Sequence, residues 1–504
     1  NPLNLCSFHL QVGGATPTEE LAYAVVSAMR VLDAVKASGR IPEAEFGKVV
    51  GRISFFVNAG IRFVEELCKM RAFVELWDRI TQERYGVTDP KHRRFRYGVQ
   101  VNSLGLTEQQ PENNVIRIVL EMLAVTLSKD ARARAIQLPA WNEALGLPRP
   151  WDQQWSLRAQ QILAYETDLL EYADLFKGSE VVEAETQALV DSAWTEVQEV
   201  LKRGGAVEAV ESGYIKQKLV ESNAARLRAI EGGEQTVVGV NKYIEGAPSP
   251  LIEDLDEAIL TVDPQVDADQ RAALKRWKED RDHDAVQKAL AELERAARNG
   301  ENMMPVSISA AHAGVTTGEW AGLLREVFGE YRAPTGVAGA TVKASGNAAQ
   351  VETVERLRGR LHELESRMGR RPKLLVGKPG LDGHSNGAEQ IAIKARDVGF
   401  DVVYEGIRVS PEQIVASALE EGVHLIGLSI LSGSHLALVP EVVERLRKAG
   451  LGDVPVVAGG IIPEADAERL RAEGVAAVYT PKDFELDNIM SDLIDLVDRE
   501  HAAE

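Results

Sequence analysis

The stretch LLVGKPGLDGHSNGAEQIA, residues 374–392, decides the fold of the last part of the chain. It opens with an apolar segment typical of a buried strand, passes through a glycine-rich turn and ends in a helical pattern. Lys378, Asp382 and His384 lie at or within this turn. A strand, a polar turn and a helix in this order indicate the first unit of a parallel α/β sheet.

The same alternation continues to the C-terminus. Continuous apolar runs, as expected of strands buried on both faces, lie at 372–378, 400–406, 424–431, 454–461 and 475–480. Helical patterns lie around 385–397, 411–421, 436–449, 464–473 and 485–499. Ser410 and Pro411 suit an N-cap and a first helical residue. Five such units predict a flavodoxin-like, doubly wound sheet over residues 371–504.

Candidate binding residues of this sheet gather where its strands end. Ligands of open α/β sheets bind outside the carboxyl ends of the strands. A carboxylate beside an imidazole fixes the tautomer of the imidazole and raises its basicity. Glycines let a ligand approach bare backbone, and a serine hydroxyl can bond to it. Residues of these kinds follow the first strand at Asp382, His384 and Gly387, the third at Ser429 and Leu431, and the fourth at Gly459 and Gly460.

The residues at this edge exclude two other kinds of site. A single histidine cannot form a zinc site, which needs three or four protein ligands. One histidine suffices when the metal is already held by a macrocycle. Phosphoacceptor receiver domains share the fold, but they need acids after the first and third strands, where this chain has Lys378-Pro379 and SILSG. A lone D-x-H or G-G is common by chance, whereas three elements in register are not.

The set D-x-H-x-x-G, S-x-L and G-G resembles the cobalamin-binding domain of mutases and methionine synthase. The resemblance implies that His384 is the lower axial ligand to cobalt, with Asp382 and Lys378 extending the hydrogen-bonded chain behind it. It also implies a slot for the nucleotide tail of cobalamin, formed by Gly387, Ser429, Leu431, Gly459 and Gly460.

The first 250 residues have a different pattern of predicted strands and helices. Strand-like segments at 3–10, 51–58, 95–103 and 132–140 are separated by long helical patterns such as 17–38 and 113–128. This larger spacing is typical of a (β/α)8 TIM-type barrel, but only four units are present. Half a barrel leaves unpaired strand edges. We therefore expect further strands ahead of Asn1 or from another chain; the opening NPLNLCSFHL, without Met, agrees with a piece lacking its N-terminal part.

Four segments of this half resemble the adenosylcobalamin-dependent acyl-CoA mutases: SFHLQVGGATPTEELAYA, RISFFVNAGIRFVEELCKMRA, VQVNSLGLTEQQPENNVIR and AWNEALGLPRPWDQQWS. Asn102-Ser103-Leu104-Gly105 stands where methylmalonyl-CoA mutases have Ser-Gly-Trp-Ser, which favours the branch that converts ethylmalonyl-CoA to methylsuccinyl-CoA. The resemblance implies an isomerase whose cofactor yields a deoxyadenosyl radical. It also implies three domains: 1–250, the C-terminal half of the catalytic barrel; 251–370, a helical linker region with an exposed Gly/Ala-rich stretch at 328–350; and 371–504, the cobalamin-binding domain.

The resemblance implies roles for six residues of the barrel half. His9, expected at the end of a barrel strand, would hydrogen-bond the migrating thioester carbonyl. Positions that contact coenzyme A are Arg52, Ser54 and Lys91, and positions near the adenosyl group are Gln100 and Glu143. Taken alone, a histidine at the carboxyl end of a barrel strand is more often functional than not. Arg52 and Lys91 could equally be surface charges, and Glu143 a helix-start acid.

Two departures from the family pattern leave alternatives open. Phe8 replaces a tyrosine, and Val12 replaces a glutamate near the adenosyl ribose. The arginine that grips the substrate carboxylate falls outside this chain. A mutase for methylmalonyl-, isobutyryl- or hydroxyacyl-CoA, or a non-catalytic cobalamin-binding module, therefore remains an alternative.

The composition restricts the partners. Asp and Glu outnumber Lys and Arg 77 to 57, a net charge of -20, which argues against a nucleic-acid partner. With only Cys6 and Cys68 there is no disulfide framework, so a reducing cytoplasm is expected. We find no signal peptide and no apolar run that could span a bilayer, and expect no membrane partner. An acyl-CoA substrate is expected, with a homodimer by analogy to the family.

Overall fold

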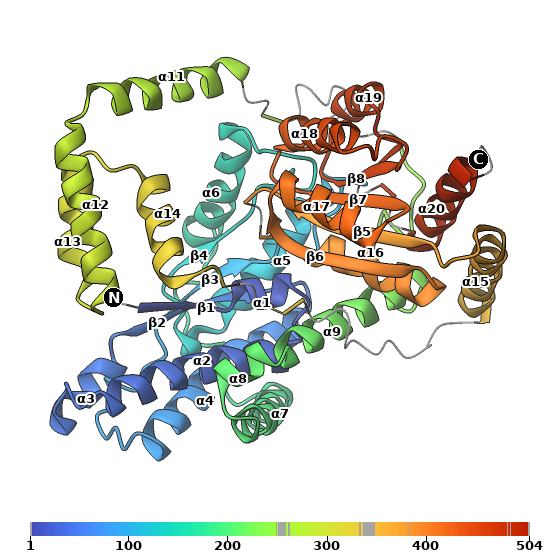
Figure 1. Ribbon diagram of the computed structural model, residues 1–504. Helices are drawn as coiled ribbons and strands as arrows, with labels where there is room; N and C mark the ends of the chain where they lie inside the picture. Colours follow the sequence, from blue (N-terminus) through green and yellow to red (C-terminus); the bar gives the residue numbers. More distant parts are fainter. Residues whose placement is uncertain are drawn as a thin grey trace. The chain divides into compact units, whose positions relative to one another are not determined.

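The computed structural model describes residues 3–247, 249, 259–260, 263–331, 334–335, 348–381, 383–480, 482–483 and 485–501. The chain forms two compact units. The first combines Asn1–Leu260 with Pro334–Glu504 and holds two parallel sheets (Figure 1). The second, Thr261–Ala333, is helical.

The sheet nearer the C-terminus is the predicted flavodoxin-like one. Its strands are β5 (Lys373–Pro379), β6 (Asp401–Val409), β7 (Leu425–Ile430), β8 (Val456–Gly460) and β9 (Ala477–Tyr479). All pairs are parallel and the order is β6-β5-β7-β8-β9. The first two strands in sequence have thus exchanged places, which is the flavodoxin order and puts a switch point between β5 and β7.

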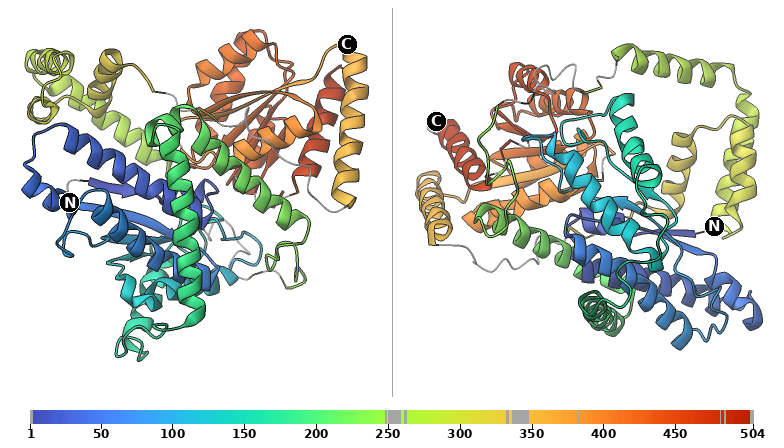
Figure 2. Two further views of the ribbon diagram at one scale, coloured as in Figure 1. Left: turned by 90° about the horizontal axis from the view of Figure 1, so that it is seen from below. Right: turned by 180° about the vertical axis from the view of Figure 1, so that it is seen from behind.

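Helices cover both faces of this sheet (Figure 2). Leu374 and Val376 of β5 pack in one cluster with α15 (Ala348–Met368), α16 (Asn386–Val398) and α20 (Leu486–His501). Leu375, between them, packs in another cluster with α17 (Pro411–Glu421), α18 (His435–Lys448) and α19 (Glu464–Ala472). Alternate side chains of a strand point to opposite faces, so a strand buried on both faces must be continuously apolar. The fold expected for residues 371–504 is confirmed.

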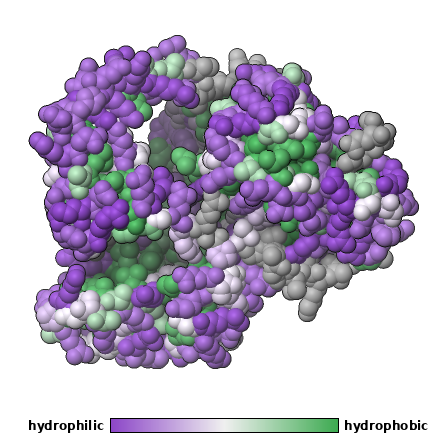
Figure 3. All heavy atoms as spheres, viewed as in Figure 1, coloured by the Kyte–Doolittle hydropathy of each residue, from purple (hydrophilic) through white to green (hydrophobic). Residues whose placement is uncertain are grey.

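The other sheet consists of β1 (Leu3–Cys6), β2 (Ile53–Ala59), β3 (Tyr97–Val101) and β4 (Ile136–Gln137). The strands are parallel and lie in sequence order, as in consecutive units of a barrel. The strand predicted over 132–140 is much shorter, because Lys129–Ala131 form a 3-10 turn and Arg132 adopts a left-handed conformation with φ of 59°. Hydrophobic side chains gather over β1 and β2, at an open edge of the sheet (Figure 3).

The helices of the barrel half are α2 (Pro17–Ala37), α3 (Glu43–Val50), α4 (Phe63–Glu83), α5 (Asn113–Leu127), α6 (Pro150–Tyr165), α7 (Glu180–Lys202), α8 (Ala206–Glu211) and α9 (Tyr214–Glu231). The main core lies between the sheet and helices α2, α4 and α7. Helix α2 begins where it does because Thr16 forms a capping box with Glu19 and Pro17 is its first residue.

The second unit contains α11 (Pro264–Asp280), α12 (His283–Arg298), α13 (Met303–His312) and α14 (Thr317–Phe328). The Arg281 guanidinium and the Glu319 carboxylate, 2.5 Å apart, join the end of α11 to the start of α14. The linker predicted over 328–350 falls mostly on 332–333 and 336–347, which lie outside the described residues. Helix α15 lies near the end of the helical region predicted over 251–370.

His9 does not end a strand, and that expectation is wrong. Strand β1 stops at Cys6, and residues Phe8–Val12 form a short helix, α1, that carries His9. Ser7 and Gln11 flank this turn, and their side chains bond to buried charges beneath it. Tertiary contacts therefore determine the conformation of residues Phe8–Val12.

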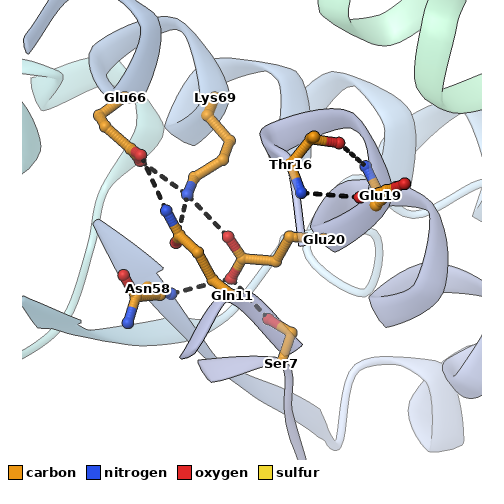
Figure 4. Close-up of polar contacts among 8 residues, drawn as sticks. All are labelled: Ser7, Gln11, Thr16, Glu19, Glu20, Asn58, Glu66 and Lys69. Carbon is orange, nitrogen blue, oxygen red and sulfur yellow. Dashed lines mark hydrogen bonds and ion pairs between the residues drawn. The ribbon is translucent and has the colours of Figure 1, made fainter. Parts of the chain in front are cut away.

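These buried charges form what we call the Lys69 cluster: Ser7, Gln11, Glu20, Asn58, Glu66 and Lys69 (Figure 4). The Lys69 ammonium lies 2.7 Å from a Glu20 oxygen and 2.6 Å from a Glu66 oxygen. It also donates to the Gln11 Oε1 at 3.0 Å, while the Gln11 Nε2 donates to Glu66 at 3.1 Å. Ser7 Oγ and the Asn58 backbone N–H both donate to Glu20, each at 2.9 Å. The cluster thus fastens α1 to α2, β2 and α4.

Pairing of opposite charges offsets the cost of burying the Lys69 cluster in the interior. Lys69 and Glu20 are fully buried, and Glu66 nearly so. Burial by itself lowers the pKa of Lys69, but Glu20 and Glu66 outweigh it and hold that pKa above its ordinary value. The lysine therefore stays charged, and losing it would leave two carboxylates without a counter-ion.

Glu121 of α5 is a further buried carboxyl group close to this cluster. Burial, together with the negative charge of Glu66, raises the pKa of Glu121 to about 9, although Arg117 opposes the shift. At neutral pH Glu121 is therefore protonated and adds no third negative charge beside Glu20 and Glu66.

Lys69→Met should lower the free energy of unfolding by about 3–5 kcal/mol, because it removes one partner of a buried ion pair. Denaturant unfolding measures this. Lys48→Met is the matched control, since Lys48 pairs with Glu45 at 2.7 Å but both side chains are at least half exposed. The control should change stability by about 0.5 kcal/mol or less. Equal losses in the two variants would contradict a special role for the buried lysine.

Glu121 should make stability fall as pH rises. Its folded pKa of about 9 lies above the ordinary 4.5, so the folded state holds the proton that the unfolded state releases in this window. Stability should drop by up to about 1.4 kcal/mol per pH unit between these values. Glu121→Gln should remove that slope, as measured by urea unfolding of both proteins from pH 5 to 9. Parallel pH profiles would mean that Glu121 is ionised in the fold.

Candidate functional site

The carboxyl ends of β5 and β7 are joined by a buried lysine. Lys378, next to last in β5, is fully buried, and its ammonium donates to the Ser429 carbonyl oxygen of β7 at 3.3 Å. The two residues were predicted as cofactor-binding from separate motifs, and the structure brings them together. Leu431 follows directly after β7 and is half-buried.

The two predicted glycines of β8 lie beside Ser429. Register pairs Ser429 with Gly459 and Ile430 with Gly460. Gly460 has a φ of +153°, and a Cβ there would lie 1.8 Å from the Ile430 carbonyl oxygen, so only glycine fits. A Cβ at Gly459 would make ordinary contacts with Tyr479. The close approach of bare backbone to β7 therefore depends on Gly460.

His384 lies in the loop between β5 and α16 and is exposed. Gly387, in the first turn of α16, has open space where a Cβ would be. Asp382, the predicted partner of His384, lies outside the described residues. The open space at Gly387 and the glycine backbone of β8 fit a bulky ligand with a narrow tail, and an exposed imidazole beside them fits an axial ligand to a metal that a macrocycle holds.

Glu143 and Gln100 lie at the facing end of the other sheet. Gln100 is on β3, paired with Asn58 of β2, and is half-buried. Glu143 follows β4 in the loop before α6. Burial raises the pKa of Glu143, while a Ser103 hydrogen bond and the proximity of His384 oppose the rise. His384 thus lies within electrostatic range of Glu143.

The loop that carries His384 is fastened to the barrel half. Lys216 of α9 lies 2.5 Å from the buried Glu389 carboxylate and donates to the Ser385 hydroxyl at 3.0 Å. Asn386 donates to the Val12 carbonyl oxygen of α1 at 3.4 Å and also bonds to Asn223. These contacts could not be predicted from the sequence, because polar residues on a helix usually face water.

Arg52, Ser54 and Lys91 lie apart from these groups. Arg52 is exposed and directly precedes β2, and Ser54 lies near the start of that strand, donating to the Leu3 carbonyl oxygen at 3.1 Å. Lys91 is exposed in the loop after α4. Arg52 and Ser54 are thus at the amino end of the sheet, and His9, Gln100 and Glu143 at its carboxyl end.

In the part of the chain that the structure describes, no three histidines, cysteines or acids are grouped to hold a metal ion. None of its helices combines the length and apolar character needed to cross a membrane.

Known families match the chain over both sheets. A family described as "Methylmalonyl-CoA mutase" matches residues 1–330, and "B12 binding domain" matches residues 372–484. The second match covers the strand ends that hold Lys378, His384 and Ser429.

Individual relatives show that identity differs between two branches of the family. Identity is 61% to the ethylmalonyl-CoA mutase of Cereibacter sphaeroides and 63% to that of Methylorubrum extorquens. Both alignments cover 99% of this chain, and they cover 75% and 71% of the two relatives. Identity to the methylmalonyl-CoA mutase of C. sphaeroides is 34%, over 95% of this chain and 66% of that protein. The chain belongs to the methylmalonyl-CoA mutase family, and its similarity within that family is greater to ethylmalonyl-CoA mutases than to methylmalonyl-CoA mutases.

Proposed function

We propose that this chain catalyses the adenosylcobalamin-dependent rearrangement of ethylmalonyl-CoA to methylsuccinyl-CoA. The observation that carries the proposal is the meeting of two sets of residues in one compact unit. The loop with His384 contacts α1, which holds His9, and influences Glu143. The 61% and 63% identity to ethylmalonyl-CoA mutases supports this substrate over methylmalonyl-CoA.

The cofactor residues have distinct roles in this proposal. His384 would hold the cobalt of adenosylcobalamin through its imidazole, and Asp382 and Lys378 would supply the polar groups behind it. Gly387, Ser429, Leu431, Gly459 and Gly460 would hold the nucleotide tail. Gly459 and Gly460 leave the end of β8 without side chains, which supports this arrangement.

Adenosylcobalamin supplies, when bound, the organic radical that starts the rearrangement. The protein then has to hold, polarise and shield the reactants. His9 donates a hydrogen bond to the thioester carbonyl that migrates. Gln100 and Glu143 bind the adenosyl group from the barrel side. Asn386 and Lys216 close the loop of His384 onto the barrel, which keeps water from the reacting atoms.

Coenzyme A binds at the other end of the sheet in this proposal. Arg52 and Lys91 contact its phosphates, and Ser54 contacts the chain that leads to the thioester. Since β2 has seven residues, about 20 Å separates its two ends. The pantetheine arm would run along the inner face of β2, past Phe56, to bring the thioester to His9.

Phe8 and Val12, the two departures from the family pattern, both make contacts in the fold. Phe8 is buried, and its ring meets the His9 ring edge-on, with centroids 5.3 Å apart. Val12 offers its carbonyl oxygen to Asn386. Both residues thus have packing or backbone roles that need neither a hydroxyl nor a carboxylate, which supports retained activity.

We further propose the domain boundaries 1–250, 251–370 and 371–504, a cytoplasmic location and a homodimer, with no nucleic-acid or membrane partner. The family matches at 1–330 and 372–484 support a boundary near 370. The net charge of -20 supports the absence of a nucleic-acid partner, and the two free cysteines support the cytoplasmic location.

Turnover of ethylmalonyl-CoA tests the function. We expect methylsuccinyl-CoA to form only when adenosylcobalamin is present, and methylmalonyl-CoA to be a poorer substrate by kcat/KM. Mass spectrometry of the product CoA esters measures both. Efficient conversion of methylmalonyl-CoA alone would assign the other branch, and tight corrinoid binding without any turnover would assign a carrier.

The role of His384 has its own test. The Co(II) form of the loaded protein should show nitrogen hyperfine splitting from a protein imidazole in its electron paramagnetic resonance spectrum. His384→Ala should lose that splitting, because its imidazole is the proposed ligand to cobalt. His362→Ala, on the exposed surface of α15, is the control and should keep it. Splitting that survives in the His384 variant would remove the axial assignment.

A further inference from the structure

His9 has a neighbour that the proposed mechanism does not use. The Cys6 Sγ lies 3.3 Å from the His9 Nδ1. Cys6 is the last residue of β1, and His9 lies in the middle of α1. Along β1, Leu3 and Leu5 pack against the core, so Cys6 points to the opposite, exposed face, which is the inner face of the barrel half. The thiol and the imidazole thus share the face on which the substrate would lie.

The sulfur keeps its own proton. Partial burial raises the pKa of the Cys6 thiol, and the negative charge of Glu20 adds to the rise. The backbone N–H groups of Phe8 and His9 point at the sulfur and oppose the rise without cancelling it. Cys6 is therefore a neutral thiol at neutral pH, and it accepts hydrogen bonds from the first turn of α1.

This environment decides which partner donates in the Cys6–His9 contact. The thiol keeps its proton, so it has an S–H that can donate to an unprotonated Nδ1 at 3.3 Å. An S–H that donates to Nδ1 leaves the proton of a neutral imidazole on Nε2. Within the described part of the chain, Nε2 has no hydrogen-bond partner. The ring would then present one unused N–H donor.

The backbone beneath the ring is already fixed. The Lys69 cluster holds Ser7 on one side of His9 and Gln11 on the other. The rotation of the His9 side chain is therefore the main freedom left. The Phe8 ring restricts it by an edge-on contact, at an interplanar angle of 78°.

We propose that Cys6 is a positioning residue for His9, whose S–H bond to Nδ1 holds the imidazole as the Nε2–H tautomer and directs that N–H to the thioester carbonyl. The carbonyl as target rests on the proposed function. The tautomer does not, because it concerns the Cys6–His9 contact and needs no bound substrate. A neutral donor can polarise the migrating carbonyl without transferring a proton to it.

Nitrogen-15 NMR of histidine-labelled protein tests the tautomer directly. In the wild-type protein we expect His9 to show a protonated Nε2 and an unprotonated Nδ1. Cys6→Ser should keep this pattern, because a hydroxyl can donate to Nδ1 and accept from the helix N–H groups. Cys6→Ala should give averaged signals of two exchanging tautomers. His9→Gln assigns the resonances.

Kinetics of the adenosylcobalamin-loaded protein give the second measurement. Loss of one hydrogen bond should lower kcat of Cys6→Ala about three- to tenfold with little change in KM. Cys6→Ser should recover most of the rate. Cys68→Ala removes the other thiol, which is buried in α4 near Val182, and should leave the His9 signals unchanged.

The outcomes separate the two proposals. A wild-type His9 protonated on Nδ1, or a Cys6→Ala protein with the wild-type signals and kcat, would overturn the role of Cys6. The expected tautomer in a protein that turns over no acyl-CoA would uphold the Cys6–His9 contact while the proposed function fails.

Discussion

Every functional interpretation of this chain depends on the contact between the start of α16 and the barrel half. His384 can meet the barrel residues only if the carboxyl ends of two separate parallel sheets are held face to face. Lys216 does this through the buried Glu389 carboxylate, 2.5 Å away, and through Ser385, the residue after His384. Because Glu389 is 1% exposed, separating the sheets would expose or orphan a charge. The contact therefore favours one arrangement of loop and barrel over others.

The sequence predicted the sheet of residues 371–504 well because its strands are buried on both faces. Such strands are continuous apolar runs, and the signal is local. That Lys378, Ser429 and Gly460 lie close together was predictable for a related reason. In a parallel sheet the carboxyl ends of all strands lie at one edge, so residues far apart in sequence converge there. The same topology predicts the sequential barrel strands, although not the short β4, whose length depends on a left-handed Arg132.

The long-range polar contacts could not be predicted from the sequence. The helix that carries His9 exists because Ser7 and Gln11 reach Glu20, Glu66 and Lys69, up to 58 residues away. In the sequence, Glu66 and Lys69 look like an ordinary surface pair at i, i+3 on an amphipathic helix. Only the fold shows that this face of α4 turns inward. The contacts of Lys216, Asn386 and Cys6 are likewise defined by partners distant in sequence or by the turn after β1, and not by a motif.

The distribution of charge around α1 suits chemistry that involves radicals rather than ions. Lys69 neutralises one of its two carboxylate partners, and the protonated Glu121 adds no further charge. The carboxylates are committed to Lys69, Gln11 and Ser7, so none of them is directed at His9 as a counter-ion. The cluster thus fixes the backbone on both sides of His9 without directing a carboxylate at its ring.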